Sequence, residues 1–374
     1  MMRSYGIIGT GAIGGYFAVN LQKSGFEVHC LLNSDYSHVE KEGLRLISDK
    51  GDFTVPVHSY RQIKEMPPCD IILIALKTTA NSILDYSLNN LIKKDSLVVI
   101  LQNGIGIEEE IANIIDPQRI IGGSCSIKVT KISPGIVKHE GHNLLEIASY
   151  SRNEIQANLI EQLNNFVSDL ITADINITVS THLPTMRWKK LIHNMPLSGL
   201  SVVFNSSTQK LIEDHYEEIL LLTKEIILAA KQCGADIPEN YFESRLKVLD
   251  SIKKMPAIYS SMKIDFDNRK PLELEAIYEN PIMIAKQHKI TMPLTEALYK
   301  QLQIINQNNL SKKIDDPQLI DDNYLKKRST SSSIELLVKS QQQNGILNSL
   351  PAHNDSFNIS EHKDPAQNEY TIKY

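Results

Sequence analysis

A glycine-rich hexapeptide near the N-terminus has the composition and spacing of a phosphate-binding turn. It reads Gly9-Thr10-Gly11-Ala12-Ile13-Gly14, a G-x-G-x-x-G pattern. In such a turn the first glycine permits the tight bend, the second lets the backbone approach a pyrophosphate, and the third lets a helix pack closely on the preceding strand. The N–H groups at the start of that helix would face the phosphates. Because an ordinary glycine-rich turn can share this pattern, its meaning depends on the elements around it.

A second group of polar residues recurs at the spacing of a helix face. Lys190, Asn194, Ser198 and Ser201 follow one another at intervals of three or four residues within a largely apolar segment, so a helix would place them on one side. A lysine ammonium can stabilise negative charge on an oxygen and donate a proton, and an asparagine amide can both donate and accept hydrogen bonds. The alternative is a solvated helix face. The amide and hydroxyl groups of this stripe favour contact with a polar ligand.

The glycine-rich turn lies between a predicted strand and a predicted helix. An apolar run over residues 5–8 precedes the turn, a helical segment over 16–23 ends at Ser24-Gly25, and residues 27–32 have the composition of a second strand. Glycine directly after a helical segment is a common signal for the end of a helix. This β-α-β order is the context that phosphate binding requires. The sequence therefore predicts a dinucleotide site at the N-terminus.

Two more residues that could do chemistry follow predicted buried strands. Lys77 comes directly after a nearly continuous apolar run over residues 69–76, and Asn103 comes shortly after another over 97–101. Such runs are typical of parallel strands that are covered on both faces. Ligands of open α/β sheets bind at the carboxyl ends of the strands. We therefore expect Lys77 and Asn103 to converge with the glycine-rich turn on one crevice.

The whole pattern predicts an α/β protein with an N-terminal Rossmann-type, doubly wound sheet and an all-helical C-terminal domain. In the first part we expect helices at 81–92, 108–115 and 153–170, and strands within 43–57 and at 124–129, 135–139, 143–147 and 175–177. In the second part we expect helices at 185–204, 209–234, 240–251, 272–289 and 295–306. We assign residues 1–181 to a dinucleotide-binding domain, 182–308 to a helical substrate and catalytic domain, and 309–374 to a poorly ordered polar tail.

Composition argues against several classes of function. The formal net charge of −5 gives no basis for binding nucleic acid or an anionic membrane, and no apolar stretch is long enough to span a bilayer. The four cysteines lack metal-ligand spacing, so we expect no metal site and reduced thiols. Because the N-terminus enters a strand at once, we expect no signal peptide and a cytoplasmic location.

Several separated blocks of the chain resemble the ketopantoate reductase (2-dehydropantoate 2-reductase) family. Besides the glycine-rich turn they are Leu76-Lys77, Gln102-Asn103-Gly104-Ile105-Gly106, Trp188-Lys189-Lys190-Leu191-Ile192-His193-Asn194, and Ser260-Ser261-Met262 followed by Glu273. The blocks occur in the family's order, and the resemblance covers residues 4–306. It implies a reductase that transfers a hydride from NADPH to the keto carbon of a 2-oxo acid. Ketopantoate is the first candidate substrate, with pantoate as a product that serves pantothenate and coenzyme A synthesis.

The resemblance also implies roles for individual residues. Lys190 would donate a proton to the developing alkoxide, and Lys77 would be a second lysine of the site with an electrostatic or steering role, unless it only caps a strand end. The cofactor contacts would come from the glycine-rich turn, Asn33, Lys77, Asn103 and Glu273. The substrate contacts would come from Asn103, Asn194, Ser198 and Ser261.

Two positions differ from the family pattern. Ser198 stands where a substrate-binding asparagine is usual, so one hydrogen bond to a pantoate-like hydroxyl would be shortened or lost. Asn33 stands where the family usually carries an arginine for the 2′-phosphate of NADP, and no arginine is close to it in the sequence. The acidic residue that NAD enzymes use at this strand end is also absent, although Asp35 lies two residues on. NADP is the expected cofactor, and NAD stays open.

Two other functions are compatible with parts of the sequence. One is a different two-domain dehydrogenase of the β-hydroxyacid or opine type, against which the Ser260-Ser261-Met262 block with Glu273 argues. The other is a nucleotide-binding regulatory protein without turnover, which would not need the pair Lys190 and Asn194. The expected partner is a small 2-oxo acid. The identity of that acid, the oligomeric state, with a homodimer among the options, and the role of residues 309–374 stay open.

Overall fold

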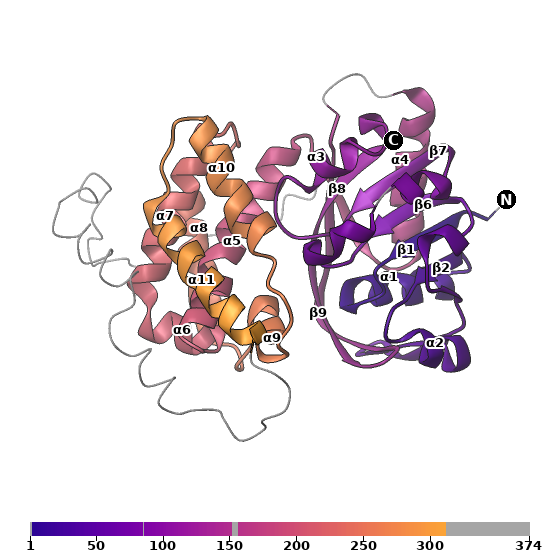
Figure 1. Ribbon diagram of the computed structural model, residues 1–374, viewed down its shortest axis with the longest axis horizontal. Helices are drawn as coiled ribbons and strands as arrows, with labels where there is room; N and C mark the ends of the chain where they lie inside the picture. The colour runs from indigo at the N-terminus through magenta and orange to yellow at the C-terminus, as the bar shows by residue number, and fades with distance from the viewer. Residues whose placement is uncertain (1, 85, 152–155, 312–374) are drawn as a thin grey trace, which may run out of the picture.

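The computed structural model describes residues 2–84, 86–151 and 156–311 (Figure 1). A mixed sheet with flanking helices forms the N-terminal part, and helices alone form the C-terminal part, on the left in Figure 1. The predicted fold class is therefore confirmed. The polar tail predicted for 309–374 falls on the end of the last helix up to residue 311, and its remainder lies outside the described residues.

The described residues contain one ten-stranded sheet. Its strands are β1 Ser4–Ile8, β2 Glu27–Leu31, β3 Leu44–Ser48, β4 Gly51–Val55, β5 His58–Tyr60, β6 Cys69–Ile74, β7 Ile92–Ile100, β8 Ile120–Ser133, β9 Ile136–Ser149 and β10 Asn176–Val179. The order is β4-β3-β9-β8-β7-β6-β1-β2-β5, with β10 beside β9. Neighbours from β5 through β2, β1, β6 and β7 to β8 are parallel. The carboxyl ends of β1, β2, β6 and β7 thus share one edge.

Three predicted strands beyond residue 120 are in fact two long ones. β8 and β9 pair antiparallel along almost their whole length, and the ladder continues past irregularities after Ile127 and Lys131. Sequence reasoning divided this hairpin because glycines and polar residues interrupt the apolar pattern. Beyond its buried ends the hairpin alternates between exposed and partly buried residues, so its outer residues need not be apolar.

Helices α1 Ala12–Lys23, α2 Tyr36–Glu42, α3 Ile107–Ala112 and α4 Ala157–Thr172 accompany the sheet. The α-helix predicted for 81–92 is wrong. Short 3₁₀ turns, Thr78–Ile83 and Tyr86–Leu91, occupy that stretch, and β7 already begins at Ile92. The segment is rich in Ser and Asn, whose side chains compete with helical hydrogen bonding. Asn81, for example, donates to Glu110 (2.9 Å) and accepts from Gln102 (2.7 Å).

The C-terminal part contains α5 Leu183–Val203, α6 Thr208–Asp214, α7 Tyr216–Gln232, α8 Tyr241–Lys253, α9 Ser261–Asp267, the π-helical turn Glu275–Glu279, α10 Asn280–Gln287 and α11 Pro293–Ser311. The helix predicted for 209–234 is divided at His215, and α9 was not predicted. α5 is the central element, because most of its side chains are buried and it packs on α7, α9, α11 and the β8–β9 hairpin. None of the described helices is long and apolar enough to cross a membrane.

Candidate functional site

The glycine-rich turn has one open position and two closed ones. Gly9 has φ +95°, and a Cβ there would lie 2.4 Å from the Leu76 backbone nitrogen. A Cβ on Gly14 would lie 2.2 Å from the Gly9 oxygen, whereas one on Gly11 would meet nothing within 4 Å. Among the residues that the structure describes, no side chain caps the first N–H groups of α1. This geometry fits a pyrophosphate that approaches the backbone at Gly11 and accepts hydrogen bonds from the start of α1.

The loops after β1, β6 and β7 meet at one edge of the sheet. Gly9 abuts the backbone of Leu76, and Gln102 donates to the Leu76 carbonyl oxygen over 2.9 Å. Lys77 and Asn103, the residues that follow these two, are therefore brought to the same edge as the glycine-rich turn. Asn103 is half-buried, and none of the described residues forms a hydrogen bond with its side-chain amide.

Lys190 lies on α5 where this helix faces the β8–β9 hairpin. Its Nζ donates to the Cys125 carbonyl oxygen over 2.7 Å. Burial, with a smaller contribution from the neighbouring Arg187 guanidinium, lowers the pKa of the ammonium. No carboxylate of the described residues lies within 4 Å of Nζ. Lys190 is thus a cation that releases its proton more easily than an exposed lysine does.

The other residues of the polar stripe on α5 differ in their surroundings. Asn194, one turn beyond Lys190, is half-buried, and its amide has no partner among the described residues. Ser198 is buried. Ser201 is fully buried, and its Oγ lies 2.8 Å from the Ser260 Oγ. It joins α5 to α9, which begins with the exposed Ser261.

A charged cluster connects the loop after β6 to the helical part. The Lys77 Nζ lies 2.7 Å from the Asp265 Oδ2 and 3.2 Å from the Glu273 Oε2, and Glu273 also accepts from the Thr78 N–H over 3.0 Å. Burial alone would lower the pKa of Lys77, but the two carboxylates outweigh it and raise the pKa. Sequence reasoning missed Asp265. The sequence feature that could have identified Asp265 is its position one helical turn after Ser261.

A buried ion pair lies behind Lys190 and was also missed. Arg187 and Glu108 are each 2% exposed, and the Arg187 Nε donates to the Glu108 Oε1 over 2.9 Å. The same guanidinium donates to the carbonyl oxygens of Gln102 (2.7 Å), Gly123 (3.1 Å) and Ile100 (3.2 Å). Arg187 therefore ties the helix of Lys190 to the loop that carries Asn103 and to the strand that carries Cys125.

The end of β2 holds the residues expected near the cofactor's ribose. The Thr10 hydroxyl donates to the Leu31 carbonyl oxygen over 3.0 Å, which fixes the glycine-rich turn to this strand. Asn33 is exposed. Asp35 is buried and accepts from the Lys131 Nζ (2.6 Å) and the Gly135 N–H (2.9 Å). Although burial alone would raise it, these two donors hold the pKa of Asp35 below its ordinary value.

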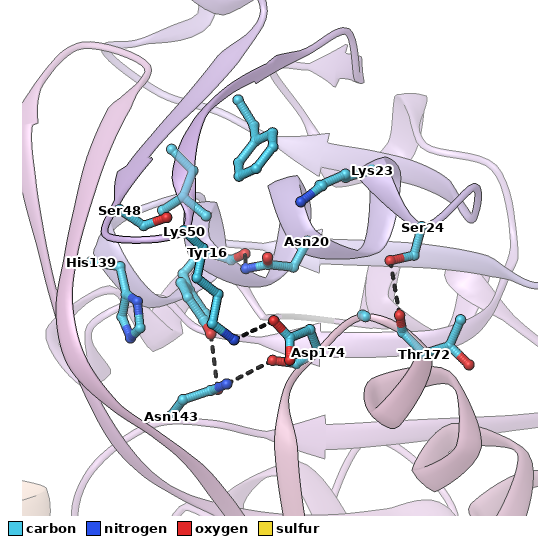
Figure 2. Close-up of a pocket in the computed structure, with 13 residues that line it drawn as sticks. Tyr16, Asn20, Lys23, Ser24, Ser48, Lys50, His139, Asn143, Thr172 and Asp174 are labelled. Carbon is cyan, nitrogen blue, oxygen red and sulfur yellow. Dashed lines mark hydrogen bonds and ion pairs between the residues drawn. The ribbon is translucent and has the colours of Figure 1, made fainter.

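A separate hollow of about 160 Å³ lies between α1, the β3–β4 hairpin and the end of α4. Figure 2 shows Asn143 between Tyr16 and Asp174, with Lys50 also directed at Asp174. None of the predicted site residues lines this hollow. Two helix C-termini meet there and favour cations, and Lys23 and Lys50 already supply them. The described residues contain no group of His, Cys, Asp and Glu that could hold a metal ion.

Comparisons with known proteins agree along most of the chain. The family models for ketopantoate reductase PanE/ApbA and for its C-terminal part match residues 5–152 and 183–306. A 2-dehydropantoate 2-reductase of Nostoc sp. is 40% identical over 310 residues, which are 82% of this chain and 96% of the relative. The crystal structure of a 2-dehydropantoate 2-reductase from Geobacter metallireducens has a TM-score of 0.75 at 29% identity, over 80% of this chain and 99% of that one. A D-mandelate dehydrogenase in complex with NADH and anilino(oxo)acetate shares the fold, with a TM-score of 0.73 at 19% identity, over 82% and 99%.

Proposed function

The chain belongs to the ketopantoate reductase family of oxidoreductases, and from this premise we propose that it reduces a 2-oxo acid with NADPH and Lys190 as proton donor. The first candidate substrate is ketopantoate. The observation that carries the proposal is the placement of Lys190, a partly desolvated ammonium without a carboxylate partner among the described residues, on the helix that Arg187 fastens to the loop of Asn103.

The residues of the chain divide the work of such a reduction. Bound NADPH would supply the hydride that adds to the keto carbon. Lys190 stabilises the negative charge that grows on the carbonyl oxygen and donates a proton to it, which yields the 2-hydroxy acid. The Cys125 carbonyl accepts one of the three N–H groups of Lys190 and leaves two for the substrate. The amides of Asn103 and Asn194, which have no hydrogen-bond partner among the described residues, can orient the substrate's oxygens.

The fit to a dinucleotide rests on three features. Of the three glycines of the turn, only Gly11 leaves its backbone accessible to an anion. Among the described residues no side chain caps the start of α1, and Asn103 lies at the same edge of the sheet. Glu273 is held beside Lys77, whose ammonium it shares with Asp265, and the loop after β6 carries Lys77 to this edge of the sheet. In that position the carboxylate can accept a hydrogen bond from a hydroxyl of the cofactor.

The direct test is turnover with a panel of 2-oxo acids. Purified protein is mixed with NADPH or NADH and each acid, ketopantoate first, and the absorbance of the reduced nicotinamide is followed. We expect the fastest loss with NADPH and a 2-oxo acid, and no loss with the matching 2-hydroxy acid. Binding of NADPH without turnover on any 2-oxo acid would favour the regulatory alternative.

The rate of reduction is expected to fall at alkaline pH. The ammonium form of Lys190 is the donor, and burial lowers its pKa from the ordinary value of 10.5. Activity is therefore present below this lowered pKa and is lost as the pH rises through it. A pH profile of kcat/KM measures this alkaline loss of activity. In the Lys190→Arg variant, which stays charged throughout this range, the alkaline decrease of kcat/KM should vanish. If the decrease persists in that variant, it comes from the titration of another group.

A further inference from the structure

The fold brings an arginine to the position where the sequence lacks one. β5 pairs parallel with β2, and the Leu32 N–H donates to the Tyr60 carbonyl oxygen over 2.9 Å. Arg61 is the next residue after Tyr60, and Asn33 is the next after Leu32. The backbone of Arg61 thus lies beside the end of β2, which in sheets of this kind faces the ribose of the adenosine half of the cofactor.

The side chain of Arg61 is fixed on the first turn of α2. Its Cζ lies 4.1 Å from the centre of the Tyr36 ring, and its Nη2 donates to the Ser37 Oγ over 3.2 Å. Stacking on an aromatic ring leaves the edges of a guanidinium free for hydrogen bonds. This contact orders an exposed side chain before any ligand arrives.

No ion pair among the described residues neutralises the charge of Arg61. Within the described part of the chain, no carboxylate oxygen lies within 4 Å of its guanidinium nitrogens. The neighbouring acids have other partners. Glu65 accepts from the backbone N–H groups of Arg61 and Gln62 (3.2 Å each), and Glu40 accepts from the Tyr36 hydroxyl (2.6 Å).

The acidic residue near the end of β2, Asp35, is buried and already has hydrogen-bond partners. Asp35 is 4% exposed and is bound by Lys131 and by the Gly135 N–H. A carboxylate in these contacts cannot take the 2′-hydroxyl of NAD, and the Lys131 ammonium compensates the repulsion that it would exert on a phosphate. The exposed Asn33 remains as an additional hydrogen-bond donor, whereas the Ser34 hydroxyl already donates to the Asp35 Oδ1 over 3.0 Å.

We propose that Arg61, ordered by Tyr36 and Ser37, binds the 2′-phosphate of NADP in place of the arginine that the family usually carries at position 33. The inference rests on the proposed function, because it assumes a dinucleotide at the glycine-rich turn. A planar guanidinium can donate two parallel hydrogen bonds to a phosphate. The chain then discriminates between NADP and NAD in spite of Asn33, so the preference is stronger than the sequence indicates.

The test measures equilibrium binding and needs no turnover. Adenosine 2′,5′-bisphosphate and 5′-AMP, which differ only in the 2′-phosphate, are titrated into the full-length protein by calorimetry. We expect the unaltered protein to bind the bisphosphate at least about tenfold more tightly, as one or two charge-assisted hydrogen bonds would give. Arg61→Ala should abolish this difference and leave the affinity for 5′-AMP within about twofold.

Arg45→Ala is the matched control, since Arg45 is an exposed arginine of the same sheet that pairs with Asp52 over 2.7 Å. This variant should bind both nucleotides like the unaltered protein. Equal affinity of the unaltered protein for the two nucleotides, or an equal loss of both in Arg61→Ala, would overturn the role of Arg61. Binding of 5′-AMP in either case would leave the reductase function standing, whereas a protein that binds neither nucleotide would refute both proposals.

Discussion

Replacing Lys190 with alanine is expected to reduce kcat at least about a hundredfold, which is the usual contribution of a positioned general acid. Cofactor binding should stay close to that of the unaltered protein, because in the proposed function the glycine-rich turn and the end of β2 hold the nucleotide. Stability should also be little affected, since the Lys190 ammonium forms one hydrogen bond within the described residues, to the Cys125 carbonyl oxygen. Steady-state rates at saturating NADPH and a fluorescence titration of NADPH measure the two effects separately.

Lys189 supplies the matched control for this experiment. It precedes Lys190 on α5, but its Nζ is directed toward the Tyr241 ring, 6.0 Å from the ring centre. Lys189→Ala should therefore turn over almost normally. Lys190→Arg keeps the positive charge but does not release a proton in this pH range. Its residual rate therefore measures the contribution of charge stabilisation without that of proton donation. A Lys190→Ala protein with normal turnover would remove Lys190 from the chemistry.

The local parts of this molecule could be predicted from the sequence. The strand, turn and helix around Gly9–Gly14 occupy consecutive residues, and each step has its own signal in composition or spacing. The face of α5 that carries Lys190 and Asn194 follows from the helical repeat alone. These predictions need no knowledge of how distant segments pack, which is why they agree with the structure.

The contacts that complete the site join residues far apart in the chain. Arg187 and Glu108 are 79 positions apart, and Lys77 and Glu273 are 196 apart. No periodicity or local motif connects such residues, so their pairing depends on the fold. Arg61 was missed for the same reason: the pairing of β5 with β2 brings it beside Asn33. The stretch 81–92 was misassigned because side chains such as Asn81 bond across loops and replace helical hydrogen bonds.

Replacing Arg187 with methionine is expected to lower the free energy of unfolding by about 3–5 kcal/mol. The substitution leaves the Glu108 carboxylate charged and buried without its partner, and it removes the donor from the carbonyl oxygens of Gln102, Gly123 and Ile100. Unfolding in urea, followed by far-UV circular dichroism, measures the loss. Arg3→Met is an informative comparison, because Arg3 lies just before β1 and pairs with Asp169 of α4, and 29% of the arginine side chain is accessible. We expect a smaller loss of stability there.

The double variant Arg187→Met, Glu108→Leu separates stability from the positioning of Lys190. With both charges gone, apolar packing should restore much of the lost stability, as replacement of buried ion pairs by apolar groups often does. The rate should not recover, because the Gln102 and Gly123 carbonyl oxygens still lack the donor that aligns Asn103 and Cys125 with α5. We therefore expect a stable protein with normal NADPH affinity and a kcat at least about tenfold below normal, as small misplacements of reacting groups produce. Recovery of both stability and kcat would instead show that the Arg187–Glu108 pair stabilises the fold and does not position Lys190.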